Sequence, residues 1–239
     1  PPPPPFFLTP NPESAIASCL VGSEMCIRDR YGAMYNKVIV FEGIDGSGKS
    51  TQLDLLAERL RADGHEVLLT REPGGSPGAE EIRALVLQGD PDRWSAETEL
   101  LLFTAARRDH LERTILPALA AGKIVLCDRF ADSTRLYQGL SRGDLRQAVD
   151  TLHTLMIGTE PNLTVLIDIN PALGLRRAKS RHGTEERFED FGESLQARMR
   201  QGFLTLAEEQ PHRIHVIDGD RSIDDVAQDI FNLVQSFLA

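Results

Sequence analysis

A glycine-rich segment with one lysine and one serine carries the most specific chemical signal in this sequence. Residues 43–50 read Gly-Ile-Asp-Gly-Ser-Gly-Lys-Ser, which fits the pattern G-x-x-x-x-G-K-[S/T] of a phosphate-binding loop (P-loop). Its glycines let successive backbone N–H groups point at phosphate oxygens, and the lysine adds a mobile positive charge. The residues predicted to bind nucleotide phosphates are Gly43, Ile44, Asp45, Gly46, Ser47, Gly48, Lys49, Ser50 and Thr51.

The flanking segments fit the same prediction. Residues 38–41 form a short, continuous apolar run that is typical of a buried strand. From Thr51 onward, apolar residues recur at helical spacing at Leu53, Leu56 and Leu60. Because strand, loop and helix are all present, we favour a phosphate-binding loop over a glycine-rich turn with a chance lysine.

A second chemical signal follows the apolar run 124–127. Asp128 and Arg129 come directly after it. A carboxylate at the end of a strand near a phosphate-binding loop can organise Mg²⁺, and an adjacent arginine can hold a phosphate with two hydrogen bonds. The alternative is a surface ion pair at the start of a loop. We therefore predict that Ser50 and Asp128 are the residues that face Mg²⁺.

The elements that must position these residues alternate along the chain. Alternation of buried strands with helices indicates a parallel sheet covered on both faces, with ligands bound beyond the carboxyl ends of the strands. The predicted fold class is therefore α/β, a P-loop NTPase-type doubly wound parallel sheet of about five strands with helices on both faces. The predicted strands are 38–41, 67–70, 124–127, 164–168 and 214–217. The predicted helices are 50–62, 79–88, 96–120, 143–158, 172–181, 193–209 and 222–238.

Composition narrows the function further. The chain has 239 residues, 41% of them hydrophobic, and a formal net charge of −10. This charge argues against a general nucleic-acid or membrane-surface binder, and no apolar run is long enough to cross a bilayer. Any anionic ligand must therefore meet a local cluster of arginine and lysine. The scattered histidines show no metal-ligand spacing, and Cys127 lies in an apolar run without an evident base.

The first 33 residues do not resemble the rest of the chain. Pro1 to Pro5 is low in complexity, and residues 20–30 can be written in codons that resemble a transposase adapter used for sequencing libraries. The alternative is a targeting peptide, but the stretch lacks a basic start and a compact apolar region and contains acids. We interpret residues 1–33 as a non-native, disordered segment and 34–239 as a single domain. That domain holds one cysteine, Cys127, which fits a reducing cytoplasm.

Several motifs together resemble the thymidylate kinase (dTMP kinase) family. Residues 128–138 are similar to its Asp-Arg-aromatic signature, although Leu136 stands where the family usually has a small residue. Residues 70–75 resemble the loop after the family's second strand, and residues 101–107 resemble its base-binding helix. The resemblance covers nearly all of 34–239, and the motifs occur in the family's order.

The resemblance implies a role for each matching residue. Phe103 and Arg107 lie four positions apart, hence on one helix face, and would stack on thymine and hydrogen-bond its 4-carbonyl. Tyr137 would disfavour a 2′-hydroxyl, and Asp45 would face the 3′-hydroxyl. Arg129 would bind the monophosphate. The predicted substrate residues are Asp45, Arg71, Phe103, Arg107, Arg129, Ser133, Thr134, Tyr137 and Gln138.

The charged segment at about 176–190 resembles the family's lid. Ser47 occupies the loop position at which some members have a basic residue, and in members without it lid arginines supply the charge. That arrangement is the bacterial type. The alternative is an ordinary solvated charged face. The predicted catalytic residues are Lys49, Asp128, Arg129, Arg177, Arg181 and Arg187.

The resemblance predicts Mg²⁺-assisted transfer of the ATP γ-phosphoryl group to dTMP, as a step of dTTP synthesis, by a cytoplasmic homodimer. Three alternatives remain: a kinase of nucleosides or of another monophosphate, a GTPase switch, and an inactive nucleotide-binding module. The sequence lacks an Asn-Lys-x-Asp motif for guanine, which argues against the switch. Retention of Lys49, Ser50, Asp128 and Arg129 argues against the inactive module.

Overall fold

The protein is described by a computed structural model that covers residues 37–90, 93–139, 144–179 and 192–238. Five parallel strands form one sheet in the order β2-β3-β1-β4-β5. The strands are β1 (Val38–Glu42), β2 (Val67–Arg71), β3 (Ile124–Asp128), β4 (Leu163–Asp168) and β5 (Ile214–Asp218). The prediction of a parallel α/β sheet is confirmed, and each predicted strand agrees to within one residue at either end.

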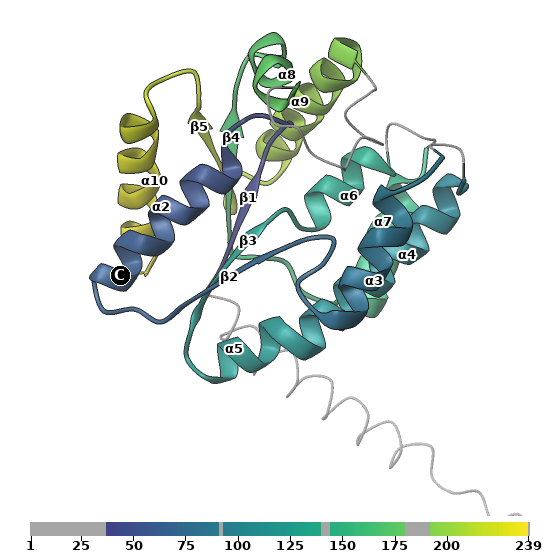
Figure 1. Ribbon diagram of the computed structural model, residues 1–239, viewed down its shortest axis with the longest axis horizontal. Coiled ribbons are helices and arrows are strands. Elements are labelled where there is room, and N and C mark those ends of the chain that lie inside the picture. Colours follow the sequence, from purple (N-terminus) through teal and green to yellow (C-terminus); the bar gives the residue numbers. More distant parts are fainter. Residues whose placement is uncertain (1–36, 91–92, 140–143, 180–191, 239) are drawn as a thin grey trace, which may run out of the picture. The chain divides into compact units, whose positions relative to one another are not determined.

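Helices surround this sheet (Figure 1). α2 (Lys49–Ala62) and α10 (Ile223–Leu238) pack side by side, while α9 (Gly192–Glu209) contacts β4, β5 and α6 (Ala131–Tyr137). The remaining elements are α3 (Pro77–Leu87), α4 (Ala96–His110), the π-helical segment η2 (Leu111–Ile115), α5 (Leu116–Ala120), α7 (Arg146–Met156) and α8 (Pro171–Lys179). No helix in the described ranges is long and apolar enough to cross a membrane.

The predicted helix 96–120 is interrupted. It changes to π-helical hydrogen bonding at η2 and resumes as α5. Pro117, near the start of α5, has no backbone N–H to donate to the carbonyl four residues earlier, so the regular α-helical pattern cannot run through this point. α6 was not predicted at all. All of its side chains are buried, including the polar ones. Apolar and polar residues therefore do not alternate with the helical period on which the prediction depends.

Each strand ends in a charged residue, and all five lie at the same edge of the sheet. Arg71 and Phe41 both pair in register with Asp128, while Asp168 pairs with Asp218. The strand interiors are apolar, and β1 and most of β3 and β4 are buried. The sheet therefore concentrates ionisable groups at its carboxyl edge, where the phosphate-binding loop leaves β1.

A buried network of ion pairs around Asp132 joins α6 to the residue that precedes β5. Asp132 accepts hydrogen bonds from both terminal nitrogens of Arg213, at 2.7 Å each, and one at 2.8 Å from Arg135. All three side chains are nearly inaccessible to solvent. Because an uncompensated buried charge is costly, this network ties α6 firmly to the start of β5.

We therefore expect Asp132→Ala to destabilise the fold by about 3 kcal/mol, the low end of the cost of breaking a buried ion pair, because Arg135 and Arg213 lose Asp132 but keep Glu160 nearby. Urea unfolding monitored by circular dichroism would measure the loss. Asp229→Ala removes an acid from an exposed pair with Arg221 and is the matched control, which should keep the wild-type midpoint. Equal midpoints for the two variants would contradict the assignment.

Candidate active site

The phosphate-binding loop occupies the turn between β1 and α2, as predicted. Gly48 adopts a φ of 95° at the amino end of α2, a left-handed conformation that favours glycine. A Cβ atom on Gly46 would lie 2.1 Å from the carbonyl oxygen of Gly174 in α8, so only glycine allows this close packing. The side chain of Lys49 folds over the loop and donates to the carbonyls of Gly43 and Ile44, at 3.0 Å each.

Burial changes the acid–base character of the loop lysine. Burial first, and the nearby Arg129 charge second, lower the pKa of Lys49 to about 8. Asp45 lies in the same loop. Burial would raise the pKa of its carboxyl, but the charges of Arg129 and Lys49 outweigh this and hold it below its usual range. The loop thus presents a cation and a carboxylate within one buried electrostatic cluster.

The two predicted metal-facing residues contact each other. Ser50 Oγ donates a 2.9 Å hydrogen bond to Asp128 Oδ2, which joins the start of α2 to the end of β3. Hydroxyl and carboxylate oxygens are ligands that suit Mg²⁺. In the described ranges no group of three or more His, Cys, Asp or Glu side chains could hold a metal ion. A magnesium ion at Ser50 and Asp128 would therefore take most of its ligands from water and substrate phosphates, which is its usual habit.

Arg129 connects the loop to a neighbouring cleft. Its backbone has a φ of 70°, an uncommon conformation for a residue with a side chain. The guanidinium donates to Asp45 Oδ1 at 2.5 Å, to Ser133 Oγ at 3.0 Å and to the Gly43 carbonyl at 3.3 Å. Strain of this kind persists only where surrounding contacts enforce it, and it clusters at functional sites.

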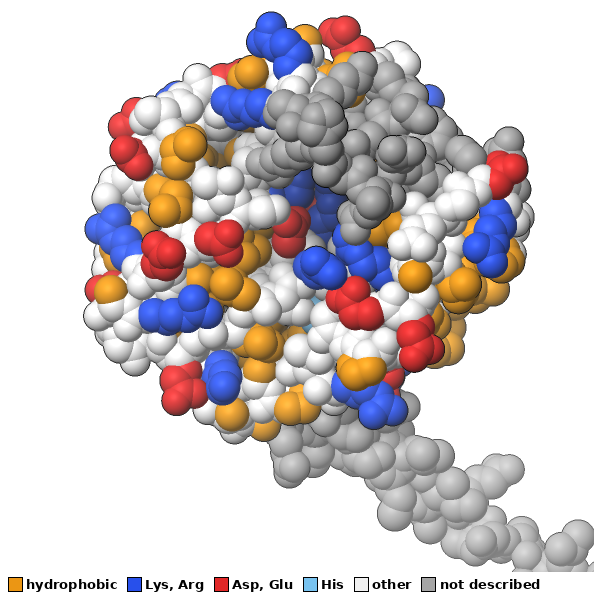
Figure 2. Space-filling model, viewed as in Figure 1, with side chains coloured by type: hydrophobic (Ala, Val, Ile, Leu, Met, Phe, Trp, Pro, Cys, Tyr) orange, Lys and Arg blue, Asp and Glu red, His pale blue; other side chains and the backbone are white. Residues whose placement is uncertain are grey.

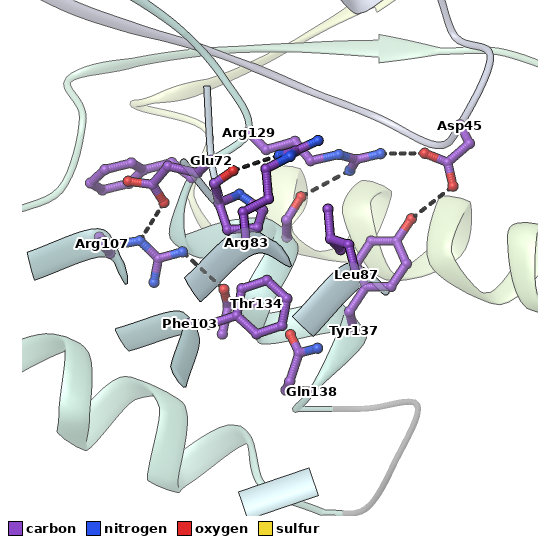
Figure 3. Close-up of a pocket in the computed structure, with 13 residues that line it drawn as sticks. Asp45, Glu72, Arg83, Leu87, Phe103, Arg107, Arg129, Thr134, Tyr137 and Gln138 are labelled. Atoms are coloured by element: carbon purple, nitrogen blue, oxygen red, sulfur yellow. Dashed lines mark hydrogen bonds and ion pairs between the residues drawn. The ribbon is translucent and has the colours of Figure 1, made fainter. Parts of the chain in front are cut away.

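A cleft opens beside Arg129, and its empty space of about 730 Å³ includes the open solvent at its mouth. Figure 3 shows the side chains that line it. Its lining comprises Asp45, Glu72, Pro73, Arg83, Leu87, Phe103, Arg107, Arg129, Phe130, Ser133, Thr134, Tyr137 and Gln138.

One end of the cleft offers an aromatic ring and a held guanidinium. Phe103 and Arg107 lie on successive turns of α4, and both line the cleft. Arg107 is 4% exposed; its Nε donates to Glu72 Oε2 at 2.6 Å and its Nη2 to Thr134 Oγ1 at 2.9 Å. Figure 3 shows this pair of contacts beside the Phe103 ring. A flat apolar surface next to fixed N–H donors fits a planar base that carries a carbonyl.

Polar side chains in and just after α6 complete the lining of the cleft. Tyr137 lies in α6, and its hydroxyl donates to Asp45 Oδ2 at 3.4 Å. Burial, reinforced by the Asp45 charge, raises the pKa of Tyr137 above its usual range, so the phenol stays protonated. Gln196 in α9 also donates to Asp45 Oδ2, at 3.2 Å. Gln138, just after α6, lines the cavity and donates to Glu99.

Several predicted residues lie elsewhere. Arg71, at the end of β2, is 55% exposed, pairs with Glu80 and does not line the cleft. Arg177 is in α8 and is partly buried. Arg181 and Arg187, with most of the predicted lid, lie outside the described residues. Cys127 is buried, and burial raises its pKa well above the usual range, in agreement with the view that it is no nucleophile.

Polar residues of this region that were not predicted include Glu42, Glu72, Arg83 and Gln196. Glu42 directly follows the apolar run of β1, and Glu72 is the first residue after β2; these positions at strand ends could have identified them. Arg83 in α3 lines the cleft and donates to the Pro73 carbonyl at 2.5 Å. No local pattern marks Gln196, because it reaches Asp45 from more than a hundred residues away in sequence.

Glu42 supports the start of α6 from inside the protein. Its Oε1 accepts from the backbone N–H groups of Phe130 and Ser133, at 2.9 and 3.1 Å, and its Oε2 accepts from Ser133 Oγ at 2.7 Å. Glu42 is 1% exposed and lies 4.0 Å from Arg129. Burial raises the pKa of Glu42 from 4.5 to about 7, with the Arg129 charge opposing the change.

The charges of the site differ from those of the whole chain. Lys and Arg side chains gather in and beside the hollow at the middle of the face seen in Figure 2. Three arginines line the cleft, namely Arg83, Arg107 and Arg129. An acidic protein therefore presents a local cationic site, as binding of a phosphorylated ligand requires.

The fold and the site define a class of protein: an α/β nucleotide-binding protein with a phosphate-binding loop and an adjacent cleft for a second ligand. The sequence profile described as "Thymidylate kinase" matches residues 41–230. The chain is 73% identical to thymidylate kinase of Ruegeria pomeroyi over 200 residues, which cover 84% of this chain and 95% of the relative. It is 64% identical to that of Dinoroseobacter shibae over 194 residues, which cover 81% and 94% of the two chains.

A solved structure agrees. The crystal structure of thymidylate kinase from Ehrlichia chaffeensis superimposes with a TM-score of 0.68 at 37% sequence identity, over 83% of this chain and 98% of that one. This protein belongs to the thymidylate kinase family. The family resemblance inferred from the sequence motifs is confirmed.

The raised pKa of Glu42 predicts a pH dependence of stability. Between about pH 4.5 and 7 the folded protein holds a proton that the unfolded chain releases. The stability contributed is complete below pH 4.5 and is lost as the pH rises through 7. From pH 5 to 8 the wild type should lose roughly 2 kcal/mol more than Glu42→Gln, which does not titrate. Urea unfolding of both proteins at the two pH values measures this, and parallel pH profiles would contradict it.

Proposed function

We propose that this protein transfers the γ-phosphoryl group of ATP to dTMP, giving dTDP and ADP, with Mg²⁺ bound at Ser50 and Asp128. One observation carries the proposal. The phosphate-binding loop and the cleft lined by Phe103 and Arg107 meet at the pair formed by Asp45 and Arg129. A nucleotide monophosphate in the cleft, with its base at Phe103, would direct its phosphate toward Arg129 and the loop.

In this mechanism the protein positions charge and excludes water. Lys49 leaves its loop carbonyls to meet the transferred phosphoryl group, and Arg129 holds the acceptor phosphate. A magnesium ion would neutralise charge on the donor phosphates. The transition state is loose, so orientation and electrostatic stabilisation supply the catalysis without a side-chain nucleophile. Arg177, Arg181 and Arg187 complete the proposed catalytic set from the lid, and Arg71 remains a proposed acceptor contact.

The cleft also supports a proposed choice of sugar and base. Phe103 stacks on thymine, Arg107 donates to its 4-carbonyl, and Thr134 steadies that guanidinium. Ser133 steadies Arg129, and Gln138 closes the cavity near the base. Tyr137 and Asp45 contact each other where the deoxyribose would lie. By resemblance to the family, we also propose that the protein is cytoplasmic and forms a homodimer. Sedimentation analysis would test the dimer.

A coupled assay of ADP release with a panel of nucleoside monophosphates tests the function. ADP release should depend on dTMP, with dUMP weaker and dCMP and purine monophosphates much weaker. Release that is independent of dTMP, or faster with another monophosphate or with a nucleoside, would overturn the proposal. A protein that starts at Met34 should match the full chain in rate and melting temperature if residues 1–33 play no part.

Replacement of Tyr137 should alter the choice between deoxyribose and ribose. Tyr137→Ala removes the ring that crowds the 2′ position, so use of the ribonucleotide counterpart should rise relative to dTMP. Tyr137→Phe keeps the ring and loses the hydroxyl that contacts Asp45, so it should retain the preference for deoxyribose. The ratio of kcat/KM values for the two acceptors measures the effect. An unchanged ratio in Tyr137→Ala would remove Tyr137 from this role.

A further inference from the structure

A chain of three side chains, namely Glu72, His110 and Thr70, begins at the Nε atom of Arg107. Glu72 Oε2 accepts from Arg107 Nε at 2.6 Å. Its other oxygen, Oε1, lies 3.2 Å from His110 Nδ1, and His110 Nε2 lies 2.7 Å from Thr70 Oγ1. Glu72 is 6% exposed and His110 is inaccessible to solvent.

Two hydrogen bonds of this chain meet at the Glu72 carboxylate. An ionised carboxylate only accepts hydrogen bonds, so His110 Nδ1 carries a proton and donates to Glu72. Burial would raise the pKa of Glu72, but the Arg107 charge and the His110 hydrogen bond outweigh it and keep the pKa below its usual range. The contact between His110 Nε2 and Thr70 Oγ1 fixes the orientation of the ring, and the ring in turn fixes the carboxylate that holds Arg107.

A glycine makes the chain possible. A Cβ atom on Gly75 would lie 2.4 Å from both His110 Nε2 and Thr70 Oγ1, and φ at Gly75 is 84°. The loop after β2 therefore closes over the contact between Thr70 and His110 only because residue 75 has no side chain. From the other side, Thr114 donates to the Gly75 carbonyl at 2.7 Å. The loop thus packs directly against the contact between Thr70 and His110.

Hydrogen bonds hold two nitrogens of the Arg107 guanidinium and leave the third for a ligand. Nε is held by Glu72 and Nη2 by Thr134. Arg107 lines the cleft. Among the described residues, none accepts a hydrogen bond from its Nη1 atom. A planar group held at two of its nitrogens cannot turn, so the direction of the remaining N–H bonds is set before a base arrives.

We propose that Thr70, His110 and Glu72 form a positioning relay that sets the base preference of the cleft by holding Arg107. This inference rests on the proposed function, since it assumes that Arg107 faces the base. N–H donors in a fixed direction suit the 4-carbonyl shared by thymine and uracil and oppose the 4-amino group of cytosine. If the relay is loosened, the guanidinium can turn away from the base. Binding of thymine and uracil is then weakened, without an equal loss for cytosine.

Thr70→Val removes the hydroxyl that contacts His110 and keeps the shape of the side chain. A lost neutral hydrogen bond is worth about two- to tenfold in an equilibrium. We expect kcat/KM for dTMP and for dUMP to fall together by about fivefold relative to dCMP, mainly through KM. Thr70→Ser retains the hydroxyl and should restore the wild-type ratios. Equal loss for all three acceptors, or a change in the ratio of dTMP to dUMP, would overturn the proposal.

Thr114→Val is the matched control. It makes the same substitution against the same glycine loop but lies outside the relay. It should leave the ratio of dTMP to dCMP unchanged, and a change as large as that of Thr70→Val would show that loop stability, not the relay, sets base preference.

A second measurement does not depend on substrate. Exchange of the Arg107 Nε proton, followed by NMR in the free protein, should be slow in the wild type and in Thr114→Val and faster in Thr70→Val. Unchanged exchange in Thr70→Val would overturn the relay even if the enzyme is active. If dTMP proved not to be a substrate, the proposed function would fail, and this exchange measurement alone would decide whether the relay positions Arg107.

Discussion

The site depends on the hydrogen bonds that the guanidinium of Arg129 makes. It contacts the phosphate-binding loop through Asp45 and Gly43, and it contacts α6 through Ser133. The loop follows β1, whereas Arg129 and α6 both follow β3, and Arg129 makes these contacts from a backbone φ of 70°. The Arg129 guanidinium therefore links the phosphate-binding loop to the cleft beside it.

Placing so many charges at low solvent exposure is costly, and the structure offsets the cost by pairing them. Glu42 accepts three hydrogen bonds, and Asp132 takes two arginines. Both carboxylates hold α6, one at its start and one on its far side. Because these pairs are already formed in the protein, the side chains of α6 that line the cleft need little rearrangement when a ligand binds. Rigidity at the acceptor side contrasts with the loop, where Lys49 is held only by two carbonyls.

Prediction from the sequence succeeded where a local pattern reports a local structure. Five apolar runs became five strands, and the G-x-x-x-x-G-K-S pattern became a loop between β1 and α2. It failed where burial or distance removes the pattern. α6 is buried on every face, so it shows no helical alternation. Glu72 was passed over because one carboxylate at a strand end does not reveal that Arg107, far along the chain, comes within 2.6 Å of it.

The sequence by itself determined the fold class, the phosphate-binding loop and the family, because these depend on glycine conformations, apolar periodicity and motifs that are contiguous in the chain. The tertiary structure decided how the site is assembled. It brought Arg83 into the cleft and left Arg71 outside it in an exposed pair with Glu80. It also joined Ser50 to Asp128. Such choices depend on which strand ends are neighbours in a parallel sheet, and strand order is a property of packing that no single segment of the chain contains.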